Sequence, residues 1–273
     1  MESYGSWVAE WRAMQLRRAC LPVVTSISLL FSATAAVTAQ DAEETIEPAP
    51  VRVLFVGNSH TKRHGGMDQL VENLVASEEP PRAIDGEILT EGGVTLEYHW
   101  NNGARQAIRE GGYDTVVLQG YLPPAITQTT EPFLEHARKL HGEATAAGAE
   151  TVFFMSWPRG YGDWSDIHDV VEAHRTIESE LGAPVAPAAY AFELARAERP
   201  DMRLVGDDLV HATRKGAYLA AATVYATLFD RSPEGLSYTY DIKVEDAAFL
   251  QSVAWRALSD WRAGVELPND PEG

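Results

Sequence analysis

The sequence predicts an α/β fold in which helices cover both faces of a central parallel sheet. Short apolar segments alternate with longer segments of helical periodicity from residue 51 to residue 264. The short segments are continuously apolar, which is typical of strands buried on both faces. No proline-rich linker, repeat or long run of like charge interrupts this region. We therefore expect a single domain over 51–264, followed by a short tail at 265–273.

The expected elements follow the chain in this alternating order. The clearest strands are VRVLFV at 51–56, TVVL at 115–118 and TVFFM at 151–155, because β-branched and aromatic residues favour strands. Weaker strand candidates lie at 83–89 and 184–186. Apolar residues recur every three or four positions, as on one helix face, in the segments 66–77, 96–109, 132–147, 166–181, 188–197, 215–228 and 244–263.

The first 39 residues have the features of a secretory signal peptide. Three arginines at 12–18 precede an apolar segment without charge at 21–39, and the small residues VTA come directly before Gln40. We expect cleavage after residue 39, with retention as a membrane anchor as the alternative. The acidic, proline-ending segment 40–50 is expected to be a disordered spacer. The mature domain would be exported to the periplasm or medium of a bacterium, without stable membrane insertion.

Charge and cysteine content exclude several classes of function. The net charge is −18, and an acidic surface repels phosphate backbones, so nucleic acid is not an expected partner. The one cysteine, Cys20, lies in the predicted leader. The mature domain would therefore have neither a disulfide nor a cysteine nucleophile. Its oligomeric state is not determined by these features.

The polar residues at the strand ends are the candidate site, because sites in parallel sheets form at the carboxyl ends of strands. Ser59 follows the first strand in GNSHT, and Gly93 follows the second in EGGVT. Near the end of the chain, DDLVH supplies Asp208 and His211. A hydroxyl, a base, a carboxylate that orients the base, and backbone donors are what a serine hydrolase needs. Asp207 is the alternative carboxylate, although the three-residue spacing favours Asp208.

Four segments resemble the blocks of the SGNH (GDSL-like) hydrolases, and most closely a bacterial branch with GNS-[HF]-T and VVLQ blocks. VLFVGNSHT and DDLVHATRKGAYLAAATVYATLF resemble the first and last blocks, while EGGVTLEYHW and YDTVVLQGY fall where the second and third occur; together they span 51–229. The resemblance implies a three-layer α/β/α sandwich of flavodoxin-like type and ester hydrolysis without metal or cofactor. It makes Ser59 the nucleophile, His211 the base and Asp208 the residue that orients it. The backbone N–H groups of Ser59 and Gly93 would bind the oxyanion.

The third block departs from the family pattern. The usual asparagine after its glycine is missing, and Gln119 is the nearest amide donor. We expect Gln119 to replace it in the oxyanion hole. Candidate substrate-binding residues around the site are Asn58, His60, Tyr121 and Trp157.

Histidines offer a competing interpretation as a metal site, formed by His60, His64 and His211. No H-E-x-x-H pattern supports it, so no metal is expected. The remaining histidines fall on predicted helices and are expected to be solvated: His99, His136, His141, His168 and His174. The α/β-hydrolases carry their serine in a G-x-S-x-G pattern near the middle of the sequence, which Ser59 does not match, so that fold is not expected.

The sequence thus predicts an exported carboxylic-ester hydrolase, with an O-acylated carbohydrate as substrate and a lipid or small acyl ester as the alternatives. Two alternatives stay open. The missing asparagine would suit a catalytically weakened carbohydrate-binding module of the same fold. An O-acyltransferase could use the same triad.

Overall fold

The computed structural model describes residues 49–120, 130–158 and 167–267. Residues 49–273 form one compact unit. The predicted leader at 1–39, most of the spacer and the end of the predicted tail lie outside the described residues, as does Tyr121. Among the described residues, no helix combines the length and the apolar character that crossing a bilayer requires.

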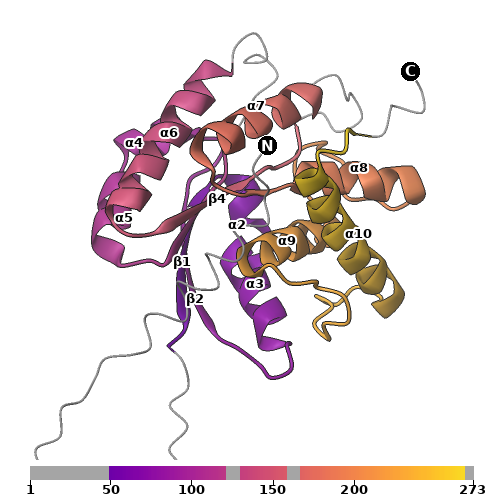
Figure 1. Cartoon of the computed structure of the whole chain (residues 1–273). Coiled ribbons are helices and arrows are strands. Elements are labelled where there is room, and N and C mark those ends of the chain that lie inside the picture. Colours follow the sequence, from indigo (N-terminus) through magenta and orange to yellow (C-terminus); the bar gives the residue numbers. More distant parts are fainter. Residues whose placement is uncertain (1–48, 121–129, 159–166, 268–273) are drawn as a thin grey trace, which may run out of the picture. The chain divides into compact units, whose positions relative to one another are not determined.

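Five parallel strands form the central sheet (Figure 1). They are β1 (Val51–Gly57), β2 (Ile84–Thr90), β3 (Thr115–Leu118), β4 (Glu150–Phe154) and β5 (Val185–Ala186). Their order across the sheet is β2-β1-β3-β4-β5, and all four neighbouring pairs are parallel. The first strand, β1, therefore lies inside the sheet, and the winding direction reverses between β1 and β3. Such a reversal is where parallel sheets place their sites.

Helices cover both faces of the sheet, which confirms the predicted three-layer α/β/α fold. On one face α3 (Met67–Ala76) and α9 (Arg214–Phe229) pack against the strands, and α8 (Ala188–Glu198) and α10 (Val244–Ala263) pack against α9 (Figure 1). On the other face lie α4 (Leu96–Asn101), α5 (Ala104–Gly111) and α6 (Glu131–Ala146), with α7 (Ile167–Leu181) against α6.

One predicted helix is in fact two. The segment 96–109 is expected to be continuous, but Gly103 adopts φ +101° and separates α4 from α5. A left-handed residue breaks the hydrogen-bond pattern of a helix, and glycine adopts that conformation without steric cost. The break lets α4 turn its buried residues Leu96 and His99 toward the sheet near the site.

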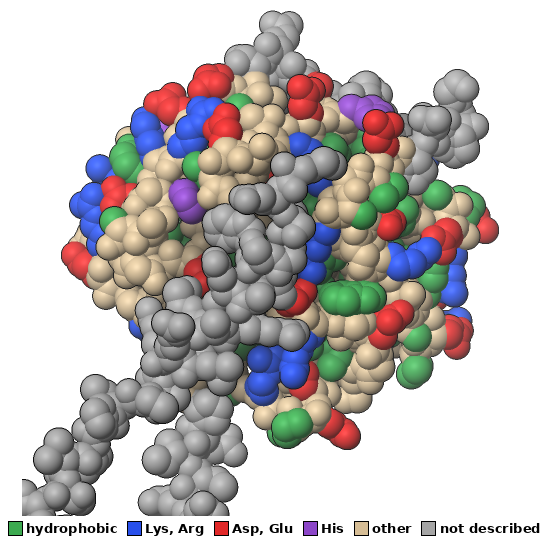
Figure 2. Space-filling view, in the orientation of Figure 1, with side chains coloured by type: hydrophobic (Ala, Val, Ile, Leu, Met, Phe, Trp, Pro, Cys, Tyr) green, Lys and Arg blue, Asp and Glu red, His purple; other side chains and the backbone are tan. Residues whose placement is uncertain are grey.

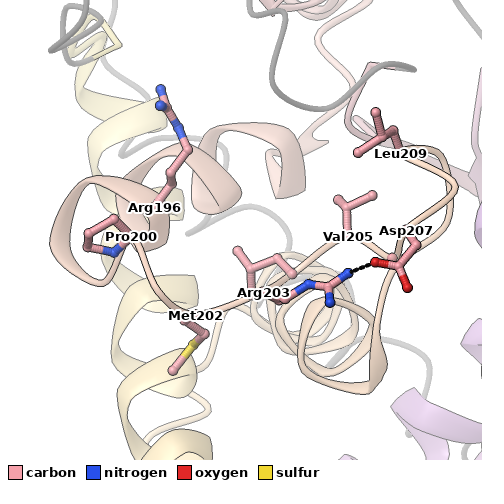
Figure 3. Close-up of a pocket in the computed structure, with 9 residues that line it drawn as sticks. Arg196, Pro200, Met202, Arg203, Val205, Asp207 and Leu209 are labelled. Carbon is pink, nitrogen blue, oxygen red and sulfur yellow. Dashed lines mark hydrogen bonds and ion pairs between the residues drawn. The ribbon is translucent and has the colours of Figure 1, made fainter.

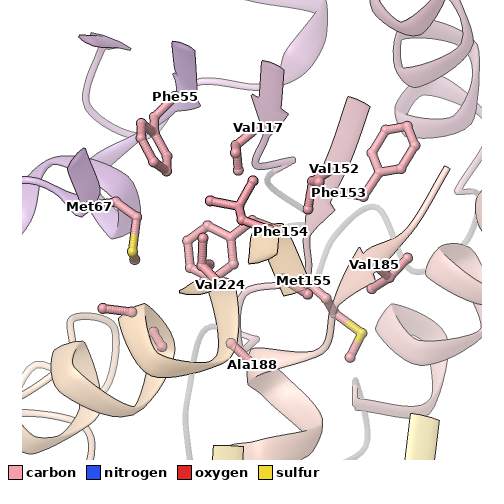
Figure 4. Close-up of a cluster of buried hydrophobic side chains, with 14 of the residues drawn as sticks. Phe55, Met67, Val117, Val152, Phe153, Phe154, Met155, Val185, Ala188 and Val224 are labelled. Atoms are coloured by element: carbon pink, nitrogen blue, oxygen red, sulfur yellow. The ribbon is translucent and has the colours of Figure 1, made fainter. Parts of the chain in front are cut away.

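The core between the sheet and α9 is made of large, fully buried side chains. Phe55, Val117 and Phe154 come from three adjacent strands and face Val224 of α9 (Figure 4). Burying a side chain of this size contributes about 1.5–3 kcal/mol. This packing holds the strands in place, so the loops that follow them begin at fixed positions.

Candidate active site

The turn after β1 holds Ser59 at the first position of the short helix α2 (Ser59–Lys62). Asn58 caps this helix, because its side-chain Oδ1 accepts a hydrogen bond of 3.0 Å from the backbone N–H of His60. A side chain on Gly57 would collide with Thr61 and Gln119. The sequence GNSHT therefore folds into one tight turn, on which Ser59 is only half-buried.

A hairpin between α8 and α9 carries the candidate base and its carboxylate. Val205 and Ala212 form a bridge across it, and Leu209 at its tip has φ +53°. Asp208 Oδ1 accepts from the backbone N–H groups of Val210 (3.1 Å) and His211 (2.9 Å). The other oxygen, Asp208 Oδ2, lies 2.7 Å from His211 Nδ1. With this three-residue spacing, one oxygen of Asp208 stabilises the loop and the other orients the imidazole of His211.

Ser59, His211 and Asp208 form a continuous series of hydrogen bonds. His211 Nε2 lies 2.9 Å from Ser59 Oγ, although the two residues are 152 positions apart in the sequence. With Asp208 on Nδ1, the neutral imidazole carries its proton on that nitrogen and leaves Nε2 free to accept the serine proton. This arrangement would allow His211 to take the proton of the Ser59 hydroxyl.

Asp208 is the carboxylate of this series, and Asp207 is not. Asp207 forms an ion pair with Arg203 instead. Donation from the His211 backbone N–H, and then from the His211 side chain and the Val210 N–H, holds the pKa of Asp208 well below its usual range. The side chain of Asp208 is 45% exposed, and Arg63 approaches its Oδ2 at 3.9 Å. Asp208 therefore stays ionised without being buried.

Gly93 lies on an exposed loop that is hydrogen-bonded to the turn of Ser59. Asn58 Nδ2 donates to the carbonyl of Val94 at 3.2 Å, which joins the loop after β2 to the turn after β1. Gly93 has φ +69°, and the space where a Cβ would stand is empty. A glycine here permits both the backbone conformation and the close approach of a ligand.

The amide of Gln119, the predicted oxyanion donor, is engaged with neighbouring residues of the fold. Its Oε1 accepts from the backbone N–H of Asn58 at 2.9 Å and from Thr61 Oγ1 at 3.1 Å. Its Nε2 donates to the Gly120 carbonyl at 2.9 Å and to Ser156 Oγ at 3.2 Å. Both amide hydrogens are thereby engaged, and the residue is buried beneath the nucleophile turn. Gln119 is a support of the turn, which corrects the sequence-based assignment.

The candidate substrate-binding residues that are described prove to be buried supports as well. Trp157 is 3% exposed, and its two faces are covered by the rings of His60 and Phe192. No face is left for stacking on a sugar or acyl group. Asn58 and His60 are also buried, and Asn58 uses its amide within the site. These buried residues lie close to Ser59 but do not present a binding surface.

Buried histidines correct a further expectation. His99, His136 and His174 are expected to be solvated, yet all three are buried. His99 Nε2 lies 2.7 Å from the carbonyl of Gly57, at the end of β1, and burial lowers the pKa of His99. The sequence alone did not indicate the contact of His99 with Gly57 or that of Ser156 with Gln119. The helical periodicity around Leu96 could have placed His99 on the inward face.

The histidines near Ser59 do not gather as metal ligands. His64 Nε2 contacts the carbonyl of Ala212 at 2.8 Å, and His211 is engaged with Asp208 and Ser59. In the described part of the sequence, no group of three or more His, Cys, Asp or Glu side chains is arranged to hold a metal ion.

A pocket of about 320 Å³ borders the hairpin that carries Asp208 and His211. Its lining is mainly apolar, with Met202 and Pro200 on one side and Val205 and Leu209 on the other (Figure 3). The ion pair between Arg203 and Asp207 closes one edge. Elsewhere the visible surface carries acidic and basic side chains interspersed (Figure 2).

Comparisons with known proteins show the fold. No protein-family model matches the sequence, and no curated protein does. The structure is similar to a DUF4886 family protein from Bacteroides uniformis ATCC 8492, with 15% identity, a TM-score of 0.59, and coverage of 82% of this chain and 99% of that chain. TesA matches with 13% identity and a TM-score of 0.53, over 66% of this chain and 98% of that one.

An acetyl xylan esterase, AlAXEase, is also similar. It matches with 15% identity and a TM-score of 0.55, over 64% of this chain and 98% of that one. A protein described as a putative GDSL-like lipase matches as well, with 14% identity and a TM-score of 0.52, so the structure has the fold that the sequence blocks predicted. At such low identities the likeness extends to the fold and no further.

Proposed function

We propose that this protein, which has the fold of the SGNH hydrolases, is an exported serine esterase that hydrolyses carboxylic esters through an acyl-enzyme. The observation that carries the proposal is the series of hydrogen bonds from Asp208 through His211 to Ser59. Both contacts are within the reach that proton transfer requires. A binding module would not need this alignment. The alignment therefore favours catalysis over the alternative of a catalytically weakened carbohydrate-binding module.

The geometry supports a two-step reaction. Ser59 Oγ attacks the ester carbonyl carbon while its proton passes to His211 Nε2, and Asp208 stabilises the resulting imidazolium. His211 then returns the proton to the leaving alcohol. Water, activated in the same way, attacks the acyl-enzyme and releases the carboxylic acid. The backbone N–H groups of Ser59 and Gly93 are the proposed donors to the oxyanion.

An O-acylated carbohydrate is the proposed substrate. Two considerations support it: structural neighbours described as acetyl xylan esterases share the fold, and the predicted leader would bring the enzyme into contact with polysaccharides outside the cytoplasm. The export part is tested on its own, by mass spectrometry of the protein recovered from a bacterial host. An N-terminus at Gln40 is expected, and a full-length protein in the cytoplasm would contradict it.

A fluorophosphonate probe and p-nitrophenyl acetate test the nucleophile. We expect the full-length protein to be labelled and to release p-nitrophenol, and Ser59→Ala to lose both. Ser259→Ala, which removes an exposed serine of α10, is the matched control and should retain both. A folded wild type that neither labels nor turns over would overturn the proposal. Acetylated xylooligosaccharides, with and without an added acceptor alcohol, then separate hydrolysis from acyl transfer.

A further inference from the structure

Ser156 and Trp157 lie just after β4, separated from it by Met155. They contact both parts of the candidate site, the turn of Ser59 and the hairpin of His211. We propose that Trp157 is a positioning residue, which holds the hairpin of His211 against the turn of Ser59 and so fixes the distance between base and nucleophile. The inference rests on the proposed function, because it concerns the alignment of the same triad.

The first observation is the hydrogen bond that Trp157 makes to the hairpin. Its indole Nε1 donates to the carbonyl of Val210 at 2.8 Å. Val210 lies between the two hairpin members of the triad, and its own N–H donates to Asp208. The indole therefore restrains the peptide unit that leads directly into His211.

The second observation is that the indole ring itself is held on both faces. It is stacked on His60 with ring centroids 4.5 Å apart and an interplanar angle of 14°. Its other face is stacked on Phe192 of α8, at 4.4 Å and 10°. A buried ring between two parallel rings has one accessible rotamer, so its N–H points in a fixed direction.

The third observation is that the same segment also contacts the nucleophile turn. His60, which stacks on Trp157, directly follows Ser59 in the sequence, and its ring meets that of His211 edge-on at 6.0 Å. Ser156 Oγ accepts from Gln119 Nε2, and Gln119 in turn supports the backbone of Asn58. A single rigid element thus contacts the turn on one side and the hairpin on the other.

The energetic consequence follows from how steeply proton transfer depends on geometry. A displacement of about 1 Å between reacting groups can reduce a rate by about 10²-fold. Without the indole donor, the hairpin would keep its own hydrogen bonds to Asp208 and the contact of His64 with the Ala212 carbonyl, but it would lose the restraint on the Val210 carbonyl that leads into His211. The loss should therefore appear in the chemical step more than in substrate binding.

Trp157→Phe in the full-length protein is the test, because it keeps an aromatic ring in the stack and removes the N–H. We expect kcat with p-nitrophenyl acetate to fall about 10-fold while KM stays within about two-fold. The rate of fluorophosphonate labelling should fall in parallel. Trp261→Phe is the matched control: it makes the same substitution at a buried indole of α10 whose Nε1 donates to Glu178 at 2.9 Å, outside the candidate site. It should lower the melting temperature at least as much and kcat much less.

Two results would overturn the inference. One is a folded Trp157→Phe protein with the kcat of the wild type. The other is a fall in kcat that tracks the melting temperature equally in both variants, which would make Trp157 merely structural. If Trp157→Phe does not fold, 3-benzothienylalanine at position 157 keeps the bicyclic ring without the N–H and decides in the same way. A wild type without labelling would instead contradict the proposed function, so the two failures are distinguishable.

Discussion

Gln119 illustrates at the scale of a residue how a support can be mistaken for a catalytic donor. It occupies the strand end where an oxyanion amide is expected, but its Oε1 accepts from Asn58 and Thr61 of the Ser59 turn. Its Nε2 donates to Gly120 and Ser156. A buried amide in such a network stabilises the fold, because any partner left without it would be an unsatisfied polar group.

Gln119→Met separates the two roles, since methionine has a similar shape and no amide. If Gln119 is a support, the substitution leaves the N–H of Asn58 without an acceptor. This loss should lower the free energy of unfolding by about 1–3 kcal/mol. Chemical denaturation measures this cost. As an oxyanion donor it would instead cost about 10²–10³-fold in kcat with little change in stability. The second pattern would restore the sequence-based assignment.

What the sequence could predict at this scale depended on the kind of contact. Ser59, Asp208 and His211 could be singled out as candidates because Ser59 follows β1 and all three match blocks of known order. The supports could not, because a contact such as Trp157 with Val210 joins residues 53 positions apart through a backbone carbonyl that any residue could provide. Burial of Trp157 between two rings follows from packing and leaves no motif.

At the scale of an element, the hairpin 205–212 includes a residue in an unfavourable backbone conformation. Leu209 has φ +53° and is 50% exposed. The left-handed conformation costs a residue with a Cβ about 1–2 kcal/mol, and Asp208 maintains it by accepting from the two N–H groups that follow. The hairpin therefore gains its shape from the carboxylate of Asp208 rather than from local backbone preference.

Leu209→Asn should relieve part of this cost, because asparagine tolerates the left-handed region. We expect the unfolding free energy to exceed that of Leu209→Ala by about 0.5–1 kcal/mol. Alanine is the matched control, since it loses the same exposed side chain and keeps the backbone penalty. Thermal and denaturant unfolding of the two variants measure the difference. Equal stabilities would mean that the backbone at 209 adopts another conformation in solution.

At the scale of the whole molecule, most of the sheet and its helices were predictable, because the strands are continuous apolar segments and the helices show clear periodicity. The expected elements that shifted did so where tertiary packing or one glycine decided the outcome, as at Gly103 between α4 and α5. Packing also placed His174 of α7 in the core beside Phe133 of α6, with ring centroids 5.0 Å apart. That burial has a consequence for the stability of the entire fold.

His174 should make the fold sensitive to acid. Its Nε2 is buried and makes no hydrogen bond to the described residues, and burial lowers the pKa of His174 to about 4. An unfolded histidine titrates near pH ~6.5. Between those two pH values His174 is protonated in the unfolded protein but stays neutral in the folded protein. The free energy of unfolding is therefore highest above about pH 6.5 and falls as the pH decreases toward about 4. The decrease from this residue is at most about 3 kcal/mol.

Denaturant unfolding of His174→Leu at pH 7 and pH 4.5 measures this contribution. Leucine fills the same apolar site and cannot be protonated, so the decrease in unfolding free energy between the two pH values should be smaller than in the wild type. His168→Leu, an exposed position on the same helix, should leave the decrease unchanged. Because both variants remove one histidine from α7, only the difference in burial separates them. If His174→Leu were as acid-sensitive as the wild type, His174 would have to be protonated or solvated in the folded protein.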